Sequence, residues 1–272
     1  MRTKTTITVL ATVSGLVVAG AAAAVPATAA TTVNMEAVVK AAMWDPYKPN
    51  EALTPGSGPS VKIVEQALAA KGLLAGKYVD GHFGTSTTSA YAKYQKSLGY
   101  SGLAASGLPG KGSLASLGKG RYTLTRIISV GAKTTWSGKT VNQRTANMLK
   151  AAGKRAGQSL TLTQGSYHSG TGASAGTHDG GGVVDVSVSG LSSVNGTVKA
   201  LREVGFAAWH RLPSQGPWGE HIHAVAISDT DMSPQAQEQA GAYFQGRNGL
   251  ANNGKDDGPQ VKKVTWEEYQ RR

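Results

Sequence analysis

The chain has 272 residues, a formal net charge of +12 at pH 7 and no cysteine. The absence of cysteine excludes disulfides and thiolate metal sites, and the length fits one large domain or two small ones. There is no run of basic residues and no interleaving of basic and aromatic residues. Nucleic acid is therefore not an expected partner, whereas the charge favours an anionic surface such as a cell wall.

Residues 1–30 have the composition of a secretory signal peptide. Arg2 and Lys4 precede the apolar run ITVLATVSGLVVAG, and the segment ends in the small residues of AAAAVPATAA, which suit a signal peptidase. A retained membrane anchor is the alternative. No later segment has the roughly 18 apolar residues that a spanning helix needs. We therefore expect a secreted monomer, extracellular or associated with the cell wall, without stable membrane association after cleavage.

Residues 31–57 read as a lead-in, because a short helical pattern is followed by Pro, Gly and Ser. Residues 58–118 then predict a compact all-α bundle of three helices. The first begins near Val61, the second covers 85–99, and a third short helix lies in GKGSLASLG. Between the first two, Phe83 in the loop VDGHFG is expected to fill the bundle interior. No acid–base constellation occurs here.

This order of helix, DG-x-FG loop, helix and closing SLASLG resembles the peptidoglycan-binding domain of secreted wall enzymes. VDGHFGTSTTSAYAKYQKSLG is the most specific part, with Tyr94 where such domains usually have phenylalanine. The resemblance implies peptidoglycan as a partner.

After a linker at residues 119–126, residues 127–246 predict an α+β domain with a small, mainly antiparallel sheet. Helical patterns cover 140–157 and 192–205, and the strand patterns are LTLTQGSY, VVDVSV and HIHAVAI. Helices and short strands without a regular βαβ repeat are typical of the α+β class. Residues 247–272 read as a polar C-terminal tail without an assigned function.

The stretch THDGGGVVDV places His178 seven residues before Asp185, with three glycines between them. If the glycines form a turn into a strand, both side chains converge. His221 and His223 are two apart in another predicted strand, so they share a face. Two histidines and a carboxylate match the three-ligand set of a catalytic zinc site, and Glu220 is the candidate base for a metal-activated water. Structural histidines bonded to backbone carbonyls are the alternative, and a phosphate cradle at DGGG lacks the following helix and lysine.

HDGGGVVD resembles the H-x-x-G-x-A-x-D segment of the zinc D-alanyl-D-alanine carboxypeptidase family, with Val183 in place of the usual alanine, and EHIH resembles its later E-x-x-H element. The resemblance covers about residues 127–227. It implies one Zn²⁺ per chain, a role for Glu220 as general base and a role for His221 in stabilising the transition state. The ligands that it implies are His178, Asp185 and His223.

Four further residues are expected to bind substrate. The family often has an arginine after a glycine-aromatic pair, where this chain has His168, and an imidazole lacks the permanent bidentate grip of a guanidinium. Arg211, in the loop before EHIH, is the candidate replacement; Gln164 and Ser166 are expected to line the same cleft. His210, beside Trp209, is interpreted as loop packing.

The sequence therefore predicts a secreted zinc metallopeptidase that cuts the peptidoglycan stem or cross-bridge, as a carboxypeptidase or an endopeptidase. The alternatives are a non-catalytic wall-binding protein on a degenerate peptidase fold and a cell-wall amidase.

Overall fold

The computed structural model describes residues 1, 31–48, 52–170, 172–249 and 251–272, so residues 2–30 of the expected signal peptide lie outside the described part. Residues Thr31–Arg272 form one compact unit. Helices and small, mainly antiparallel sheets are mixed along this unit, which confirms the α+β class. None of the described helices is long and apolar enough to cross a membrane.

The α-helices have the following bounds: α1 Met35–Trp44, α2 Gly58–Ala69, α3 Thr85–Ser97, α4 Lys111–Gly118, α5 Gln143–Ala156, α6 Val194–Glu203, α7 Pro234–Phe244 and α8 Trp266–Gln270. The strands are β1 Thr32–Asn34, β2 Thr123–Thr125, β3 Lys133–Trp136, β4 Lys139–Asn142, β5 Leu162–Gln164, β6 Val183–Ser187, β7 Phe206–Arg211 and β8 His221–Ala226.

Helices α2, α3 and α4 pack around an apolar interior, and Phe83 is fully buried in it, as the sequence predicts. The loop before α3 is tied to α2 by a carboxylate. Glu65 accepts hydrogen bonds from the backbone amides of Asp80 and Gly81 and from the hydroxyl of Thr87. The turn is therefore held by a buried acid.

The main sheet has four antiparallel strands in the order β5-β6-β8-β7. Strand β6 lies between β5 and β8, so the segment that follows His178 lies beside the strand that carries His223. Two smaller strand pairs lie outside this sheet. The hairpin β3–β4 is antiparallel, whereas β1 pairs with β2 in parallel.

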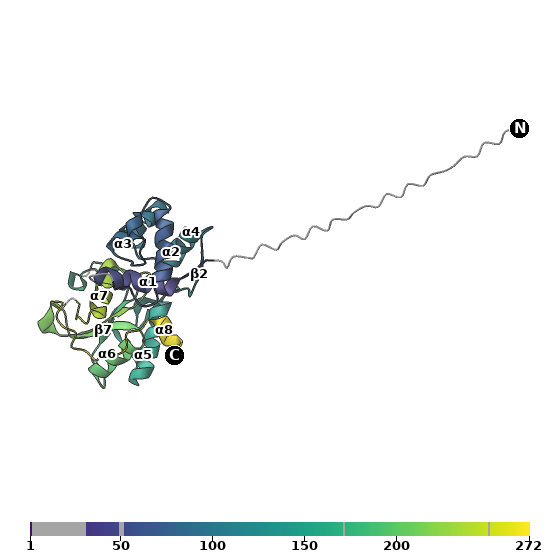
Figure 1. Cartoon of the computed structure of the whole chain (residues 1–272). Coiled ribbons are helices and arrows are strands. Elements are labelled where there is room, and N and C mark those ends of the chain that lie inside the picture. The colour runs from purple at the N-terminus through teal and green to yellow at the C-terminus, as the bar shows by residue number, and fades with distance from the viewer. Residues whose placement is uncertain (2–30, 49–51, 171, 250) are drawn as a thin grey trace. The chain divides into compact units, whose positions relative to one another are not determined.

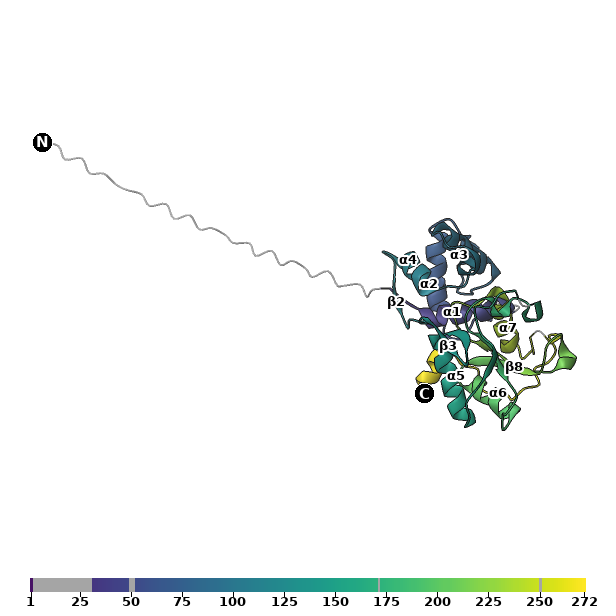
Figure 2. The same cartoon turned by 180° about the vertical axis from the view of Figure 1, so that it is seen from behind.

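Side chains alternate between the two faces of the main sheet. Helices α5 and α6 cover one face, where Met148 and Leu201 meet Val184, Val186 and Ile222. Helix α7, together with α1, covers the other face around Val183, Trp209 and Val225. Figures 1 and 2 show α5 beside α6 and α1 beside α7 in both views. The second face also carries the candidate ligands.

Several elements lie in segments without a clear sequence pattern. Strand β7 and helix α7 were not expected, and α1 is a core helix inside the segment interpreted as a lead-in. The C-terminal residues also pack closely, because Asp256, Val264 and Thr265 are buried.

Candidate metal centre

Two rows of residues across the main sheet build the site. In the first row, Gln164 on β5 lies opposite Asp185 on β6, which lies opposite His223 on β8. In the second row, Ser187 on β6 lies opposite His221, which lies opposite Arg211 on β7. Because alternate residues of a strand share a face, both rows project toward α7.

His178 reaches this face from the short 3-10 helix Thr177–Asp179, and three glycines connect it to β6. Each glycine lies too close to its neighbours for a side chain. A Cβ would stand 2.3 Å from the carbonyl oxygen of Asp231 at Gly180, 2.7 Å from the Tyr167 hydroxyl at Gly181, and 2.7 Å from Asp229 Cβ at Gly182. The glycine run therefore lets the His178 loop pack tightly before the strand begins.

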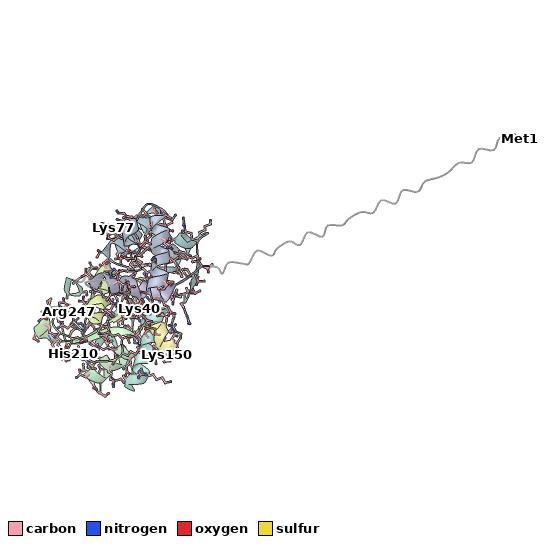
Figure 3. The ribbon with its side chains drawn as sticks, in the orientation of Figure 1. Met1, Lys40, Lys77, Lys150, His210 and Arg247 are labelled. Carbon is pink, nitrogen blue, oxygen red and sulfur yellow. The ribbon has the colours of Figure 1, made fainter. Side chains whose placement is uncertain are left out.

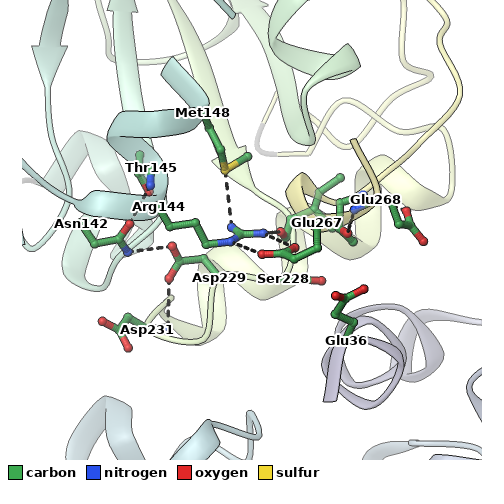
Figure 4. Close-up of polar contacts among 12 residues, drawn as sticks. Glu36, Asn142, Arg144, Thr145, Met148, Ser228, Asp229, Asp231, Glu267 and Glu268 are labelled. Atoms are coloured by element: carbon green, nitrogen blue, oxygen red, sulfur yellow. Dashed lines mark hydrogen bonds and ion pairs between the residues drawn. The ribbon is translucent and has the colours of Figure 1, made fainter. Parts of the chain in front are cut away.

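A buried polar network around Asp229 (Figure 4) packs against the glycine loop at Gly182. Asp229 is fully buried, and its carboxylate accepts hydrogen bonds from Asn142 Nδ2 at 2.8 Å and from the Asp231 amide at 3.0 Å. Burial raises the pKa of Asp229, while nearby Arg144 lowers it in part. Arg144 itself is bonded to Glu267 at 2.7 Å. The C-terminal helix α8 is thereby linked to the base of the loop.

His178, Asp185 and His223 form a buried cluster in which one potential ligand atom from each residue lies within 4.8 Å of the others. The shortest approaches are to Asp185 Oδ1, which is 2.7 Å from His223 Nδ1 and 3.3 Å from His178 Nε2. The structure therefore brings together the three residues expected as ligands.

The outward-facing nitrogen of each imidazole is held by an oxygen that accepts a hydrogen bond. Nδ1 of His178 is 2.8 Å from the Gly165 carbonyl, and Nε2 of His223 is 2.7 Å from Gln239 Oε1. A nitrogen that faces such an acceptor carries the proton in a neutral imidazole, which leaves a lone pair on the other nitrogen. Both lone pairs then face Asp185, as the ligands of a metal ion must.

The charges of the cluster fit a divalent cation. Burial alone would raise the pKa of Asp185, but His178 and His223 hold it well below its usual range, so the carboxylate is ionised. Burial lowers the pKa of His223, although Asp185 opposes this shift. A neutral His223 has one proton, yet an acceptor faces each of its nitrogens. A cation between Asp185 and the unprotonated nitrogen of His223 would supply the positive charge that a second proton on His223 would otherwise provide. Nitrogen and carboxylate ligands suit zinc or a similar ion.

The two groups that orient the ligands were not predicted from the sequence. Gly165 lies on the loop after β5, and Gln239 lies on α7, whose apolar stripe is short and consists mostly of alanine. The N-cap Ser233 followed by Pro234 was the available signal for this helix. Partners of this kind fix the tautomer of a metal-binding histidine.

The cluster opens into a cavity of about 300 Å³ that Gln164, His221, Arg211 and Glu220 also line. His221 Nδ1 is 2.7 Å from the Gly219 carbonyl, so its Nε2 faces the cavity, 3.6 Å from Asp185 Oδ1. Arg211 is 2% exposed, and one of its terminal nitrogens donates to the Asn248 carbonyl at 2.6 Å. Burial lowers the pKa of Arg211 to about 10, which leaves a cation at neutral pH.

Glu220 lines the cavity, but its carboxylate does not contact the cluster. Its Oε1 is 2.8 Å from His210 Nε2, and both side chains are partly exposed. His210 alternates with Trp209 and Arg211 along β7, so it belongs to the opposite face of the sheet. His210, interpreted from sequence as loop packing, is therefore the partner of the expected base.

The remaining three candidates differ in position. Gln164 lines the cavity; its Nε2 donates to the Ser174 hydroxyl at 2.8 Å, and its Oε1 is 3.2 Å from the same hydroxyl. Ser166 is buried, and its hydroxyl donates to the Val183 carbonyl at 2.7 Å. His168 is exposed on the loop after β5, and its amide donates to the His178 carbonyl. Ser166 and His168 line a neighbouring cavity instead.

We compared the chain with models of protein families, with curated proteins and with solved structures, and none of the three comparisons found a match.

Proposed function

We propose that the protein is a secreted zinc-dependent peptidase that hydrolyses a peptide bond in the stem or cross-bridge of peptidoglycan. The observation that supports this best is the convergence of the His178 and His223 imidazoles on the ionised, buried carboxylate of Asp185, with the outward nitrogen of each ring held by an oxygen acceptor. The resemblance of HDGGGVVD and EHIH to zinc D-alanyl-D-alanine carboxypeptidases gives the same ligand set.

His178, Asp185 and His223 would hold the zinc. When bound, the ion supplies a Lewis acid that polarises the scissile carbonyl and activates a water molecule. Glu220 would accept the proton of that water and return it to the leaving amine. For this the Glu220 side chain must leave His210; both side chains are partly exposed. His221 faces the cavity through Nε2 and, as an imidazolium, would stabilise the developing oxyanion.

Arg211 supports the carboxypeptidase mode of the proposed reaction. It is a cation in the wall of the cavity, on the strand next to His221, and it stacks on Trp209 at 4.9 Å. A guanidinium binds a carboxylate with two hydrogen bonds, so Arg211 would take the role of the arginine that this chain lacks at His168. In this assignment the substrate ends in a free carboxylate just beyond the scissile bond.

The helical part, α2 to α4, would bind peptidoglycan, in agreement with the resemblance of residues 58–118. The positive net charge of the chain would add a long-range attraction to an anionic wall. The hydrogen bond between Glu220 and His210 favours a second candidate, a non-catalytic wall-binding protein, because the base is not directed at the cluster.

Zinc content and muropeptide digestion test the proposal together. We expect the mature protein to hold one zinc and to release a terminal residue. His178→Ala should lose both properties, whereas Glu220→Gln should keep the metal and lose at least a hundredfold in rate, as expected for a general base. Release of the whole stem would indicate an amidase. A protein that holds no zinc and leaves all muropeptides intact, yet sediments with cell walls, would overturn the peptidase proposal.

A further inference from the structure

A second cavity of about 300 Å³ adjoins the cavity of the metal centre. Both cavities are lined by Thr163 and Gln164, so they meet at the edge strand β5. The second cavity lies between β5 and the hairpin β3–β4, and it includes Lys139 and His168. None of the roles proposed above uses this space.

The Arg211 side of the first cavity and the second cavity lie at opposite edges of the four-stranded sheet. Gln164 is in register with Asp185, and Arg211 lies on β7, at the far side of the sheet from β5. Strands are spaced by about 4.8 Å, and an extended peptide advances about 3.3 Å per residue. A peptide whose carboxylate is held by Arg211 would therefore reach the second cavity about two or three residues before the scissile bond.

The charged side chain that lines the second cavity is a cation. Lys139 is exposed at the start of β4 and, among the residues that the structure describes, forms no ion pair. His168 adds an imidazole from the loop after β5. Nearby, Lys133 lies 4.0 Å from the centre of the Tyr167 ring. The lining contains no acidic residue, in contrast to the first cavity.

The position of the second cavity is fixed relative to the metal centre. The Ser166 amide donates to the Thr140 carbonyl at 2.8 Å, which joins the hairpin to the loop after β5. The neighbouring residue, Gly165, orients His178 through its carbonyl, and a Cβ at Gly165 would stand 2.4 Å from the Thr140 oxygen. One rigid backbone therefore forms the wall of the second cavity and orients a metal ligand.

We infer that the second cavity is a subsite for an acidic side chain of the peptide substrate, bound by Lys139 and His168. This inference rests on the proposed peptidase function and narrows its substrate class to peptides with a carboxylate two or three residues before the cut. It also gives His168 a role, as a donor to an internal carboxylate instead of the terminal one.

The test uses two synthetic peptides that end in D-alanyl-D-alanine and carry either glutamate or glutamine three residues before the scissile bond. We expect kcat/KM of the zinc-loaded parent to be about twofold to fivefold higher for the glutamate peptide at low ionic strength, as for a partly exposed charge pair. Lys139→Gln should abolish this preference, and Lys139→Glu should reverse it. His168→Gln should reduce it in part.

The matched control is Lys150→Glu, which makes the same charge change on an exposed face of α5 (Figure 3). It should leave the preference unchanged. The subsite would be overturned if Lys139→Glu and Lys150→Glu reduced the preference for the glutamate peptide equally. It would also be overturned if the parent showed no such preference. Binding of both peptides to the metal-free protein, measured by calorimetry, separates the two proposals. A glutamate preference in binding without hydrolysis would contradict the peptidase, whereas equal hydrolysis of both peptides would contradict only the subsite.

Discussion

At the scale of single residues, the metal centre depends on oxygen atoms that hold the imidazoles from outside. Among the described contacts, Gly165 and Gly219 accept through their backbone carbonyls, and only Gln239 accepts through a side chain. Its amide nitrogen has no hydrogen-bond partner among the described residues. The described hydrogen bonds of the Gln239 side chain are therefore confined to His223. A substitution at Gln239 tests whether this contact fixes the tautomer of His223.

Gln239→Leu should lower zinc affinity about 10-fold to 100-fold, the usual effect of removing the partner of a ligand histidine. The reason is that His223 would lose the acceptor that fixes its proton on Nε2. Competition with a chromophoric chelator measures the affinity. Gln237→Leu is the control, since Gln237 is also buried on α7 but contacts no histidine in the described hydrogen bonds. Equal affinities in the two variants would contradict the role of Gln239.

At the scale of elements, the loop from His178 to β6 and the loop from α2 to α3 are both held by buried carboxylates. Asp229 supports the first and Glu65 the second. The two acids support different parts of the protein. Asp229 supports the loop that carries a candidate metal ligand, whereas Glu65 supports the helical part.

Gly182→Ala should destabilise the fold by more than about 3 kcal/mol, because it combines a positive φ with a clash against buried Asp229. Gly190→Ala is the matched control: its φ is +76°, almost the +79° of Gly182, and nothing lies within 4 Å of its Cβ. The control should cost about 1–2 kcal/mol, the strain of the left-handed conformation alone. Urea denaturation measures both, and similar losses would show that the close packing at Gly182 contributes nothing.

Glu65 should make the stability of the protein depend on pH. Burial raises the pKa of Glu65 to about 7 from 4.5, although hydrogen bonds from Gly81 and Thr87 oppose the shift. A raised pKa in the folded state means that the stabilising contribution is complete below pH 4.5 and is lost as the pH rises toward 7, by about 3 kcal/mol. Glu65→Gln should flatten this part of the profile and unfold at no lower urea concentration than the parent at pH 8. An unchanged slope between pH 4.5 and 7 would refute this assignment.

At the scale of the whole molecule, the C-terminal residues hold several parts of the fold together. Arg202 on α6 is 1% exposed; it bonds to Asp256 at 2.7 Å and to the carbonyls of Ala208 and Pro259. Helix α8 contacts both α5 and α1 through ion pairs of Glu267 and Glu268. The segment interpreted from sequence as a polar tail is thus a structural part of the unit.

Asp256→Asn should lower the free energy of unfolding by about 3–5 kcal/mol, because it leaves the Arg202 cation buried without its counter-charge. Glu203→Gln, which removes an exposed ion pair with Arg155, should cost less than about 1 kcal/mol. Thermal unfolding of the metal-free proteins checks the difference. A loss at Asp256 as small as at Glu203 would mean that the C-terminal segment is held by apolar contacts alone.

The candidate metal ligands could be predicted from the sequence, but the residues that contact the ligands and the candidate base could not. His178 and Asp185 were predicted because their spacing across three glycines is a local property of the chain. Strand alternation placed His221 and His223 on one face, and only the resemblance of EHIH to the carboxypeptidase family favoured His223 as the ligand. The Glu220–His210 hydrogen bond depends on the pairing of β7 with β8, and β7 itself was not expected. The contact of Gln239 with His223 requires α7 to lie on the ligand face, a long-range property that a polar, weakly periodic segment does not reveal.

The contacts of α1 have a consequence for how the protein acquires its fold. Lys40 and Glu36 of α1 pair with Glu268 and Arg271, residues more than 220 positions away. Contacts of such long sequence separation form late and slow the folding reaction. A chain that is still being synthesised cannot close this junction, because α8 follows all the other described helices. The contact between α1 and α8 is therefore completed only after α8 has left the ribosome.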